Sequence, residues 1–193
     1  MARTRGTGAL GRLPAADVLT LVAVGLVVLL VSLPCLRDFA VRENEREARA
    51  LLPRLAGLTG QKLETAEPAR AALDPVLDIG RLFAARPGLA AGLPDARAGD
   101  DGRTLRHHGY VFAGLRAASG GRVALLAWPW DHGRTGEQAY LFLPGQGLFE
   151  HPNPGGRWSG ARGPELDELD ELAAPPDPSA GWSACARQSA PHL

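Results

Sequence analysis

The hydrophobic pattern is strongest near the start of the chain, where residues 18–36 form an uncharged run (VLTLVAVGLVVLLVSLPCL). A helix over this run would be about 28 Å long, which matches the hydrocarbon thickness of a bilayer. A core helix of that length in a soluble protein normally carries a polar face, and this run has no charged residue. Residues 17–36 are therefore predicted to form a transmembrane helix.

The charges on the two sides of the run predict its orientation. Arg3, Arg5 and Arg12 precede it, with no acid before Asp17, whereas arginines and acids alternate after it. The positive-inside rule then places residues 1–16 in the cytoplasm as a basic leader and the remaining domain outside the inner membrane. A cleaved signal peptide is disfavoured because Pro34-Cys35-Leu36-Arg37 lacks the small residues of a cleavage site.

An amphipathic helix is predicted to continue from the membrane over residues 37–60. Apolar residues recur there at intervals of three and four, and charged residues fill the opposite face. Pro53 is predicted to kink or end this helix, and Gly57 and Gly60 to close it. Its apolar face requires a partner elsewhere in the domain.

Residues 61–108 are predicted to be a region of short helices and loops. Asp78 is a candidate cap for a helix through Ala84, and Pro87-Gly88 would stop that helix. Asp100-Asp101-Gly102 resembles a fragment of a calcium loop, but the distal Glu of an EF-hand is missing. We interpret it as a solvated turn.

The pattern of residues 109–151 changes to that of short strands joined by Gly-containing turns, which predicts an antiparallel meander. The run VALLAW (residues 123–128) is apolar on both faces, as expected of a central strand. The sheet and the amphipathic helix can bury each other's apolar faces. The predicted fold is α+β, with a core of Tyr110, Phe112, Val123, Leu125, Leu141 and Phe142 against Leu51, Leu52 and Leu55.

Residues 152–193 are rich in Pro and Gly and are predicted to be a largely disordered tail. Trp158 and Trp182 are able to dock onto the domain, but nothing in the sequence requires it. Cys35 and Cys185 provide no disulfide framework, and both a single bridge and an unpaired Cys185 remain open.

Composition and motifs argue against several classes of function. The 21 basic residues balance the 21 acidic ones and form no long basic block, which disfavours a nucleic-acid partner. Almost all basic residues are Arg, a bias typical of GC-rich bacterial genomes. No HExxH or Gly-x-Ser-x-Gly sequence is present. We therefore expect no enzymatic activity, no catalytic residues, no cofactor and no small-molecule substrate.

Two His-containing pairs, His107-His108 and Asp131-His132, are the candidates for a metal site. Adjacent residues on a strand point to opposite faces, so such a pair seldom supplies two ligands. No metal site is predicted for this reason. Trp128-Pro129-Trp130 is predicted to end a strand and close the core.

Asp17 stands directly before the apolar run, and Pro34 follows seventeen residues later. With the basic leader and the amphipathic continuation, this spacing resembles type IV pilins and the pseudopilins of type II secretion. Residues 108–151 (HGYVF…VALLAWPWDHGRTGEQAYLFLPGQGLFEH) are similar to the C-terminal sheet of a pilin-like group. The resemblance covers roughly residues 10–60 and 107–150.

The chain departs from that family at the leader. Family members are cut after a Gly five positions before the acid, which is normally Glu, whereas Arg12 occupies that place here and Gly11 lies one residue too far. Pro14 also disturbs the expected new N-terminus. These departures favour a minor member of an assembly over a major fibre subunit.

The resemblance implies a non-enzymatic, membrane-anchored structural protein of a type II secretion or type IV pilus-like assembly. Its expected partners are membrane lipid and other pilin-like subunits, with Asp17 and Pro34 as assembly residues. The alternative is a monomeric, membrane-tethered binding module outside the cytoplasm whose loop, residues 129–138, recognises a partner.

The predicted orientation can be tested with protease. Protease added to intact spheroplasts should digest the domain after Arg37 and leave the membrane segment, because the apolar run would span the bilayer with its N-terminus inside. Immunoblotting of the membrane fraction measures the outcome. Protection of the domain, or its recovery in the soluble fraction, would contradict the prediction.

Overall fold

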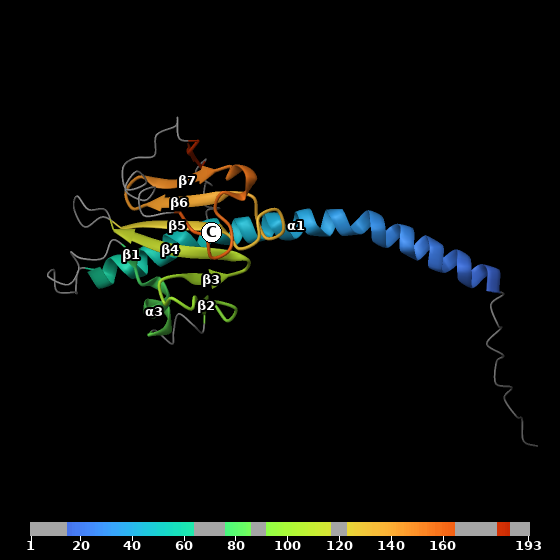
Figure 1. Ribbon diagram of the computed structural model, residues 1–193, viewed down its shortest axis with the longest axis horizontal. Coiled ribbons are helices and arrows are strands. Elements are labelled where there is room, and N and C mark those ends of the chain that lie inside the picture. The colour runs from blue at the N-terminus through green and yellow to red at the C-terminus, as the bar shows by residue number, and fades with distance from the viewer. Residues whose placement is uncertain (1–14, 64–75, 86–91, 117–122, 165–180, 186–193) are drawn as a thin grey trace, which may run out of the picture. The chain divides into compact units, whose positions relative to one another are not determined.

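The computed structural model describes residues 15–63, 76–85, 92–116, 123–164 and 181–185 of the 193-residue chain (Figure 1). The chain forms two compact units, Met1–Asp38 and Phe39–Leu193. Helix α1 (Ala15–Leu63) begins in the first unit and ends in the second. The second unit also contains the short helix α3 (Ile79–Ala84), the 3-10 turn η1 (Pro154–Gly156) and an antiparallel sheet.

Helix α1 is continuous through Pro34 and Pro53. Of the two effects predicted for Pro53, a kink or an end of the helix, the end is therefore wrong. A proline inside a helix costs about 3 kcal/mol. Leu51, Leu52 and Leu55 are buried around Pro53, and each such burial contributes about 1.5–3 kcal/mol. The packing of these leucines therefore outweighs the cost of the proline. The helix also passes Gly57 and Gly60 and ends at Leu63.

The sheet has eight strands among the described residues, and all its pairs are antiparallel. Its order is β2-β3-β4-β5-β6-β7-β8, and β1 pairs with the far end of β4. The strands are β1 (Val76–Leu77), β2 (Arg97–Ala98), β3 (Leu105–His107), β4 (Tyr110–Arg116), β5 (Val123–Pro129), β6 (Ala139–Leu143), β7 (Gly147–His151) and β8 (Ser183–Ala184). The predicted α+β class and the β4–β7 meander are confirmed.

Strands β1, β2 and β3 lie in the region predicted to contain only helices and loops. Each has two or three residues, too few to show the alternation that identifies a strand. The helix expected after Asp78 is confirmed as α3, although the Asp78 side chain does not cap it. The Asp78 carboxylate instead pairs with Arg81 at 3.0 Å.

The predicted turn at Asp101 is also confirmed. The Oδ1 atom of Asp101 accepts hydrogen bonds from the backbone N–H groups of Arg103 and Thr104, at 2.9 and 3.2 Å. Partial burial opposes ionisation of Asp101, but these hydrogen bonds outweigh it and lower the pKa of the carboxyl group. The Asp101 carboxylate therefore stabilises the turn in which it lies.

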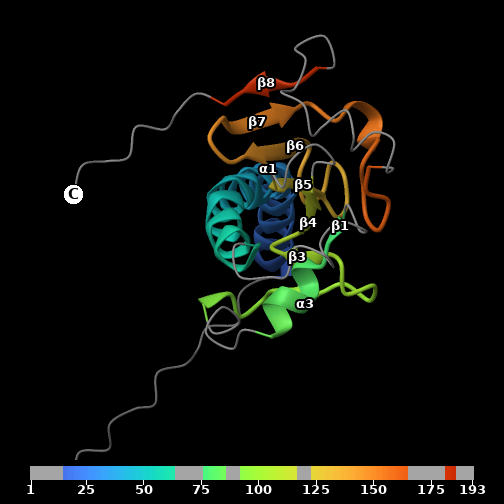
Figure 2. The same cartoon turned by 90° about the vertical axis from the view of Figure 1, so that its left-hand side faces the viewer.

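One face of the sheet packs against the second half of α1, as Figure 2 shows. Leu51, Leu52 and Leu55 share a buried cluster with Tyr110, Phe112 and Leu125, and Phe142 packs at its edge. This part of the predicted core is confirmed. Small residues such as Ala48 and Ala127 allow the helix and sheet to approach closely.

Leu141 does not belong to this core, so that part of the prediction is wrong. In the register of β5 and β6, Leu141 lies opposite Leu126, and Phe142 lies opposite Leu125. Neighbouring residues of a strand point to opposite faces, so Leu141 and Phe142 cannot share one core. Leu141 packs on the far face with Leu126 and Trp128. The side chain of Val123 lies outside the described residues.

The far face is covered by part of the segment predicted to be a disordered tail. That prediction is wrong for residues 152–164 and 181–185, where Trp158 and Trp182 are buried and β8 pairs with β7. Asn153 is fully buried: its Nδ2 donates to Trp158 O at 2.9 Å, and Trp158 N donates to its Oδ1 at 3.0 Å. Residues 165–180 and 186–193 lie outside the described residues.

We predict that Leu125→Ala destabilises the protein by about 2–5 kcal/mol, because Leu125 is completely buried against α1 and the change leaves a cavity. Thermal unfolding of the full chain in detergent, followed by circular dichroism, measures the effect. Arg134→Ala is the control, since 77% of the Arg134 side chain is exposed. Equal melting temperatures for the two variants would contradict this core.

Candidate functional site

Among the described residues, α1 is the one helix that is long and apolar enough to cross a membrane. Its uncharged apolar run lies in its first part, from Val18 to Leu36. The large side chains of this part are exposed throughout; Leu19, for example, is 72% exposed. The two hydroxyl groups within this part donate to backbone carbonyls four residues earlier, Thr20 to Ala16 at 2.9 Å and Ser32 to Val28 at 2.7 Å. Their polar atoms are thereby satisfied inside the helix, as an apolar surrounding requires.

Asp17 lies in the first turn of α1, where the helix dipole favours a negative charge. Pro34 lies inside the same helix, about 26 Å further along at 1.5 Å per residue. Both side chains are exposed. The structure thus places the two assembly residues on one helix and does not bring them together.

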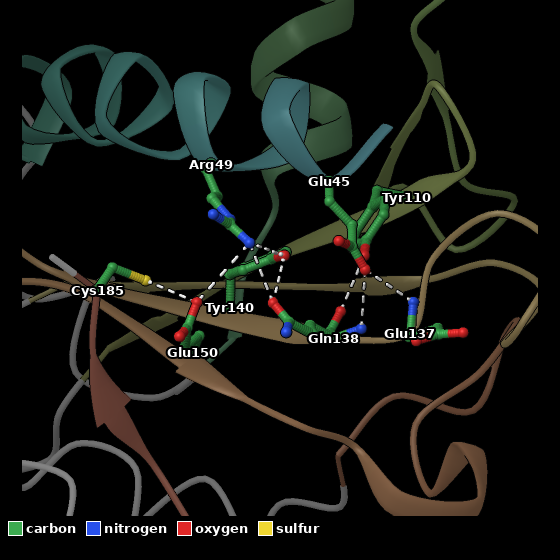
Figure 3. Close-up of polar contacts among 8 residues, drawn as sticks. All are labelled: Glu45, Arg49, Tyr110, Glu137, Gln138, Tyr140, Glu150 and Cys185. Carbon is green, nitrogen blue, oxygen red and sulfur yellow. Dashed lines mark hydrogen bonds and ion pairs between the residues drawn. The ribbon is translucent and has the colours of Figure 1, made fainter. Parts of the chain in front are cut away.

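The second part of α1 is attached to the sheet by polar side chains as well as by the core (Figure 3). The Oε1 atom of Glu45 accepts from the backbone N–H groups of Glu137 and Gln138, at 3.0 and 3.3 Å. The Nδ2 atom of Asn44 donates to Thr135 O at 2.9 Å. These two side chains fix the segment before β6 to the helix.

Arg49 is the centre of the remaining polar contacts, which Figure 3 shows between α1 and the sheet. Its Nη2 donates to Gln138 Oε1 and Tyr140 Oη, both at 3.1 Å, and lies 3.8 Å from Glu150 Oε2. The Tyr140 hydroxyl donates to Gln138 Oε1 at 2.9 Å, and the Arg49 guanidinium lies 5.0 Å from the Tyr140 ring centre. We call Glu45, Arg49, Gln138, Tyr140 and Glu150 the polar seam.

The electrostatics of the polar seam keep Arg49 charged. Burial alone would lower the pKa of Arg49, but the hydrogen bond to Tyr140 and the charge of Glu150 outweigh it and raise the pKa. Burial also raises the pKa of both Tyr110 and Tyr140, so both phenols stay protonated as donors. The polar seam is therefore built to hold the helix in place and contains no activated nucleophile.

Cys35 and Cys185 are both free thiols in the structure. The Cys185 Sγ donates to Glu150 Oε2 at 3.4 Å. Burial and the neighbouring carboxylate raise the pKa of this thiol to about 12. A thiol that stays protonated is a poor nucleophile and a poor metal ligand.

The loop after β5, which the alternative function assigns to recognition, is tightly folded. Thr135 N and Arg134 N donate to Asp131 O at 2.8 and 3.0 Å. Trp128 and Pro129 are buried and close the core as predicted, but Trp130 is 37% exposed. The guanidinium of Arg106 lies 3.8 Å from the Trp130 ring centre. Among the described residues outside α1, Trp130 is the one large apolar residue whose side chain is exposed.

The two His-containing pairs differ in whether they belong to a group that could hold a metal. His107 and His108 approach each other, with ring centres 4.1 Å apart, and gather with Glu47 of α1 into a group that could hold a metal. The sequence argument failed here because His108 follows the end of β3 and has a positive φ of 44°, so strand alternation does not apply to it. Asp131 and His132 do not join this group.

Sequence reasoning missed the polar seam and the Glu47–His107–His108 group, because both join residues about 60 to 100 positions apart. Single polar residues within an otherwise apolar pattern are the signal that was available.

Comparisons with protein-family models, with curated proteins and with solved structures found no match to this chain.

We predict that Arg49→Met destabilises the protein by roughly 1.5–3 kcal/mol, the usual range for a hydrogen bond to a charged group. Methionine keeps an unbranched side chain but removes the Arg49 hydrogen bonds to Gln138 and Tyr140 and the positive charge that faces Glu150. Arg46→Met is the matched control on the same helix, because Arg46 is exposed and such pairs contribute at most about 1 kcal/mol. Chemical unfolding of the full chain in detergent compares the two, and equal stabilities would show that the polar seam is dispensable.

Proposed function

We propose that this protein is a non-enzymatic, membrane-anchored structural protein of the pilin-like kind, a minor component of a type II secretion or type IV pilus-like assembly. Its N-terminus lies in the cytoplasm and its sheet domain lies outside the inner membrane. Its N-terminal helix packs against membrane lipid and against the helices of other pilin-like subunits. Asp17 sets the position of that helix among its neighbours.

The observation that carries the proposal is the construction of α1 from two unlike halves. The first half exposes apolar side chains all round, and the second buries one face against an antiparallel sheet. A helix that exposes apolar side chains on every face is unfavourable in water, whereas a bilayer or a bundle of like helices covers those side chains. The spacing of Asp17 and Pro34 supports the pilin-like reading in particular.

A monomeric, membrane-tethered binding module is the second candidate, and Trp130 is the observation that favours it. An exposed Trp stacked on an Arg is a combination enriched in binding hot spots. Asn44 and Glu45 hold the neighbouring segment against α1, so this surface is pre-organised. In this reading the helix is only an anchor and makes no contact with other proteins.

Asp17→Ala distinguishes the two functions. An unpaired carboxylate at the edge of lipid is costly, so in an assembly Asp17 should seek a positive partner on a neighbouring helix. The change should then reduce crosslinking between helices and leave membrane insertion intact. Cys35 is a free, exposed thiol on α1 and can serve as the crosslinking position, with Cys185→Ser removing the second thiol.

Asp38→Ala is the control for this experiment, because Asp38 is an exposed acid on the same helix beyond the apolar run. Crosslinked species are measured by electrophoresis of membranes after oxidation or bismaleimide treatment. Crosslinking through Cys35 that Asp17→Ala leaves unchanged, or that never occurs, would contradict the pilin-like proposal. If Trp130→Ala then abolished partner capture, the tethered module would replace it.

A further inference from the structure

Three side chains with metal-binding atoms meet where the end of β3 and the turn to β4 lie beside α1. Glu47 comes from the helix, His107 ends β3, and His108 lies in the turn to β4. One potential ligand atom of each lies within 4.8 Å of the others, and His108 Nδ1 lies 3.0 Å from Glu47 Oε2. Residues 60 positions apart in the chain are thus brought to one point by the packing of the helix on the sheet.

Two of these side chains carry buried polar atoms without a hydrogen-bond partner. His107 is only 7% exposed, and its Nδ1 atom makes no hydrogen bond. Glu47 Oε2 is also buried without one, since its approach to His108 lacks hydrogen-bond geometry. Leaving a buried polar atom unsatisfied costs about 1–3 kcal/mol, so two such atoms in neighbouring side chains indicate a missing partner.

Local backbone geometry explains why neighbouring histidines converge. His108 has a φ of 44° and Gly109 a φ of 77°, so the chain leaves the extended conformation directly after His107. The two rings then lie edge to face, with an interplanar angle of 81°. A Cβ atom at Gly109 would collide with Thr135, so this tight turn is kept by the packing around it.

We propose that Glu47, His107 and His108 bind a divalent transition metal of the zinc type. Two imidazole nitrogens and one carboxylate oxygen are the donor set that zinc takes in three-residue sites, with a fourth position left for water. Ligand atoms of a tetrahedral zinc site lie about 3.4 Å apart, so the more distant atoms need to move by about 1 Å. The 3.0 Å approach of Glu47 and His108 already lies close to that spacing.

The surroundings suit this role. Asp95 Oδ2 lies 3.7 Å from His108 Nε2, the ring nitrogen that does not face Glu47. A carboxylate behind a metal-binding His is the usual outer partner that orients the ring.

The bound metal joins α1 to the turn between β3 and β4. The polar seam holds the same helix to β6 and β7, so the metal adds a second attachment at a different part of the sheet. This role is structural and does not depend on whether the protein assembles as pilins do.

Metal titration of the full chain tests the proposal. The protein is purified in detergent through a tag without histidine, stripped with a chelator and titrated with Co²⁺, whose visible absorption reports its coordination. We expect one Co²⁺ per chain, displaced by one equivalent of Zn²⁺. Zinc should also raise the melting temperature, because a ligand that binds only the folded state stabilises it.

Glu47→Gln and His108→Asn should each weaken Co²⁺ binding by at least about tenfold and remove the zinc-dependent shift in melting temperature. Asn tolerates a positive φ, so the second change preserves the turn. The matched controls, Glu43→Gln on the same helix and His132→Asn, should bind as the unaltered protein does. The proposal would be overturned if the unaltered protein bound no stoichiometric Co²⁺. It would also be overturned if Glu47→Gln and His108→Asn bound Co²⁺ as tightly as the unaltered protein does.

Discussion

Strand β5 carries apolar side chains on both faces, and the described fold depends on covering both of them. Leu125 and Ala127 point toward α1, and Leu126 and Trp128 point the other way. Each large side chain left in water would forgo about 1.5–3 kcal/mol of stabilisation. The helix covers the first face. Trp158 and Trp182, which come from far along the chain, cover the second.

Apolar burial brings α1 to the sheet, but polar contacts select its position along it. Hydrophobic contacts are non-directional, and a helix with several leucines can slide by a turn without losing all of them. Glu45 and Arg49 bind particular donors and acceptors on the segment around β6. The Glu47–His107–His108 group, where we propose a metal site, lies near a different strand, β3. These polar contacts give the second half of α1 a defined position on the sheet.

The two halves of α1 differ in the burial of their side chains, and the functional argument rests on this difference. Residues 40–57 alternate between buried and exposed, whereas the apolar side chains from Val18 to Leu36 are exposed. The same boundary separates the two compact units. A single helix that serves lipid or neighbouring helices at one end and a folded domain at the other is the arrangement on which our proposed function rests.

The features that depend on local patterns of residues could be predicted before the structure was known. The run from Val18 to Leu36, the amphipathic continuation through Leu55 and the four longer strands all follow from the spacing of apolar residues. The helix after Asp78 was predicted from the residues at its two ends. Membrane compatibility follows from the same signal, since length and lack of charge suffice for it.

Tertiary structure alone decided the features that depend on contacts between distant residues. Pro53 stays helical because buried leucines on both sides outweigh its cost, and Leu141 faces away from α1 because its register places it opposite Leu126. Strands of two or three residues exist only because a neighbour pairs with them. Likewise, Arg49 meets Glu150, and Glu47 meets His107 and His108, only after α1 packs on the sheet. No spacing along the chain encodes such meetings, because the free energy that drives them comes from burying surfaces between whole elements.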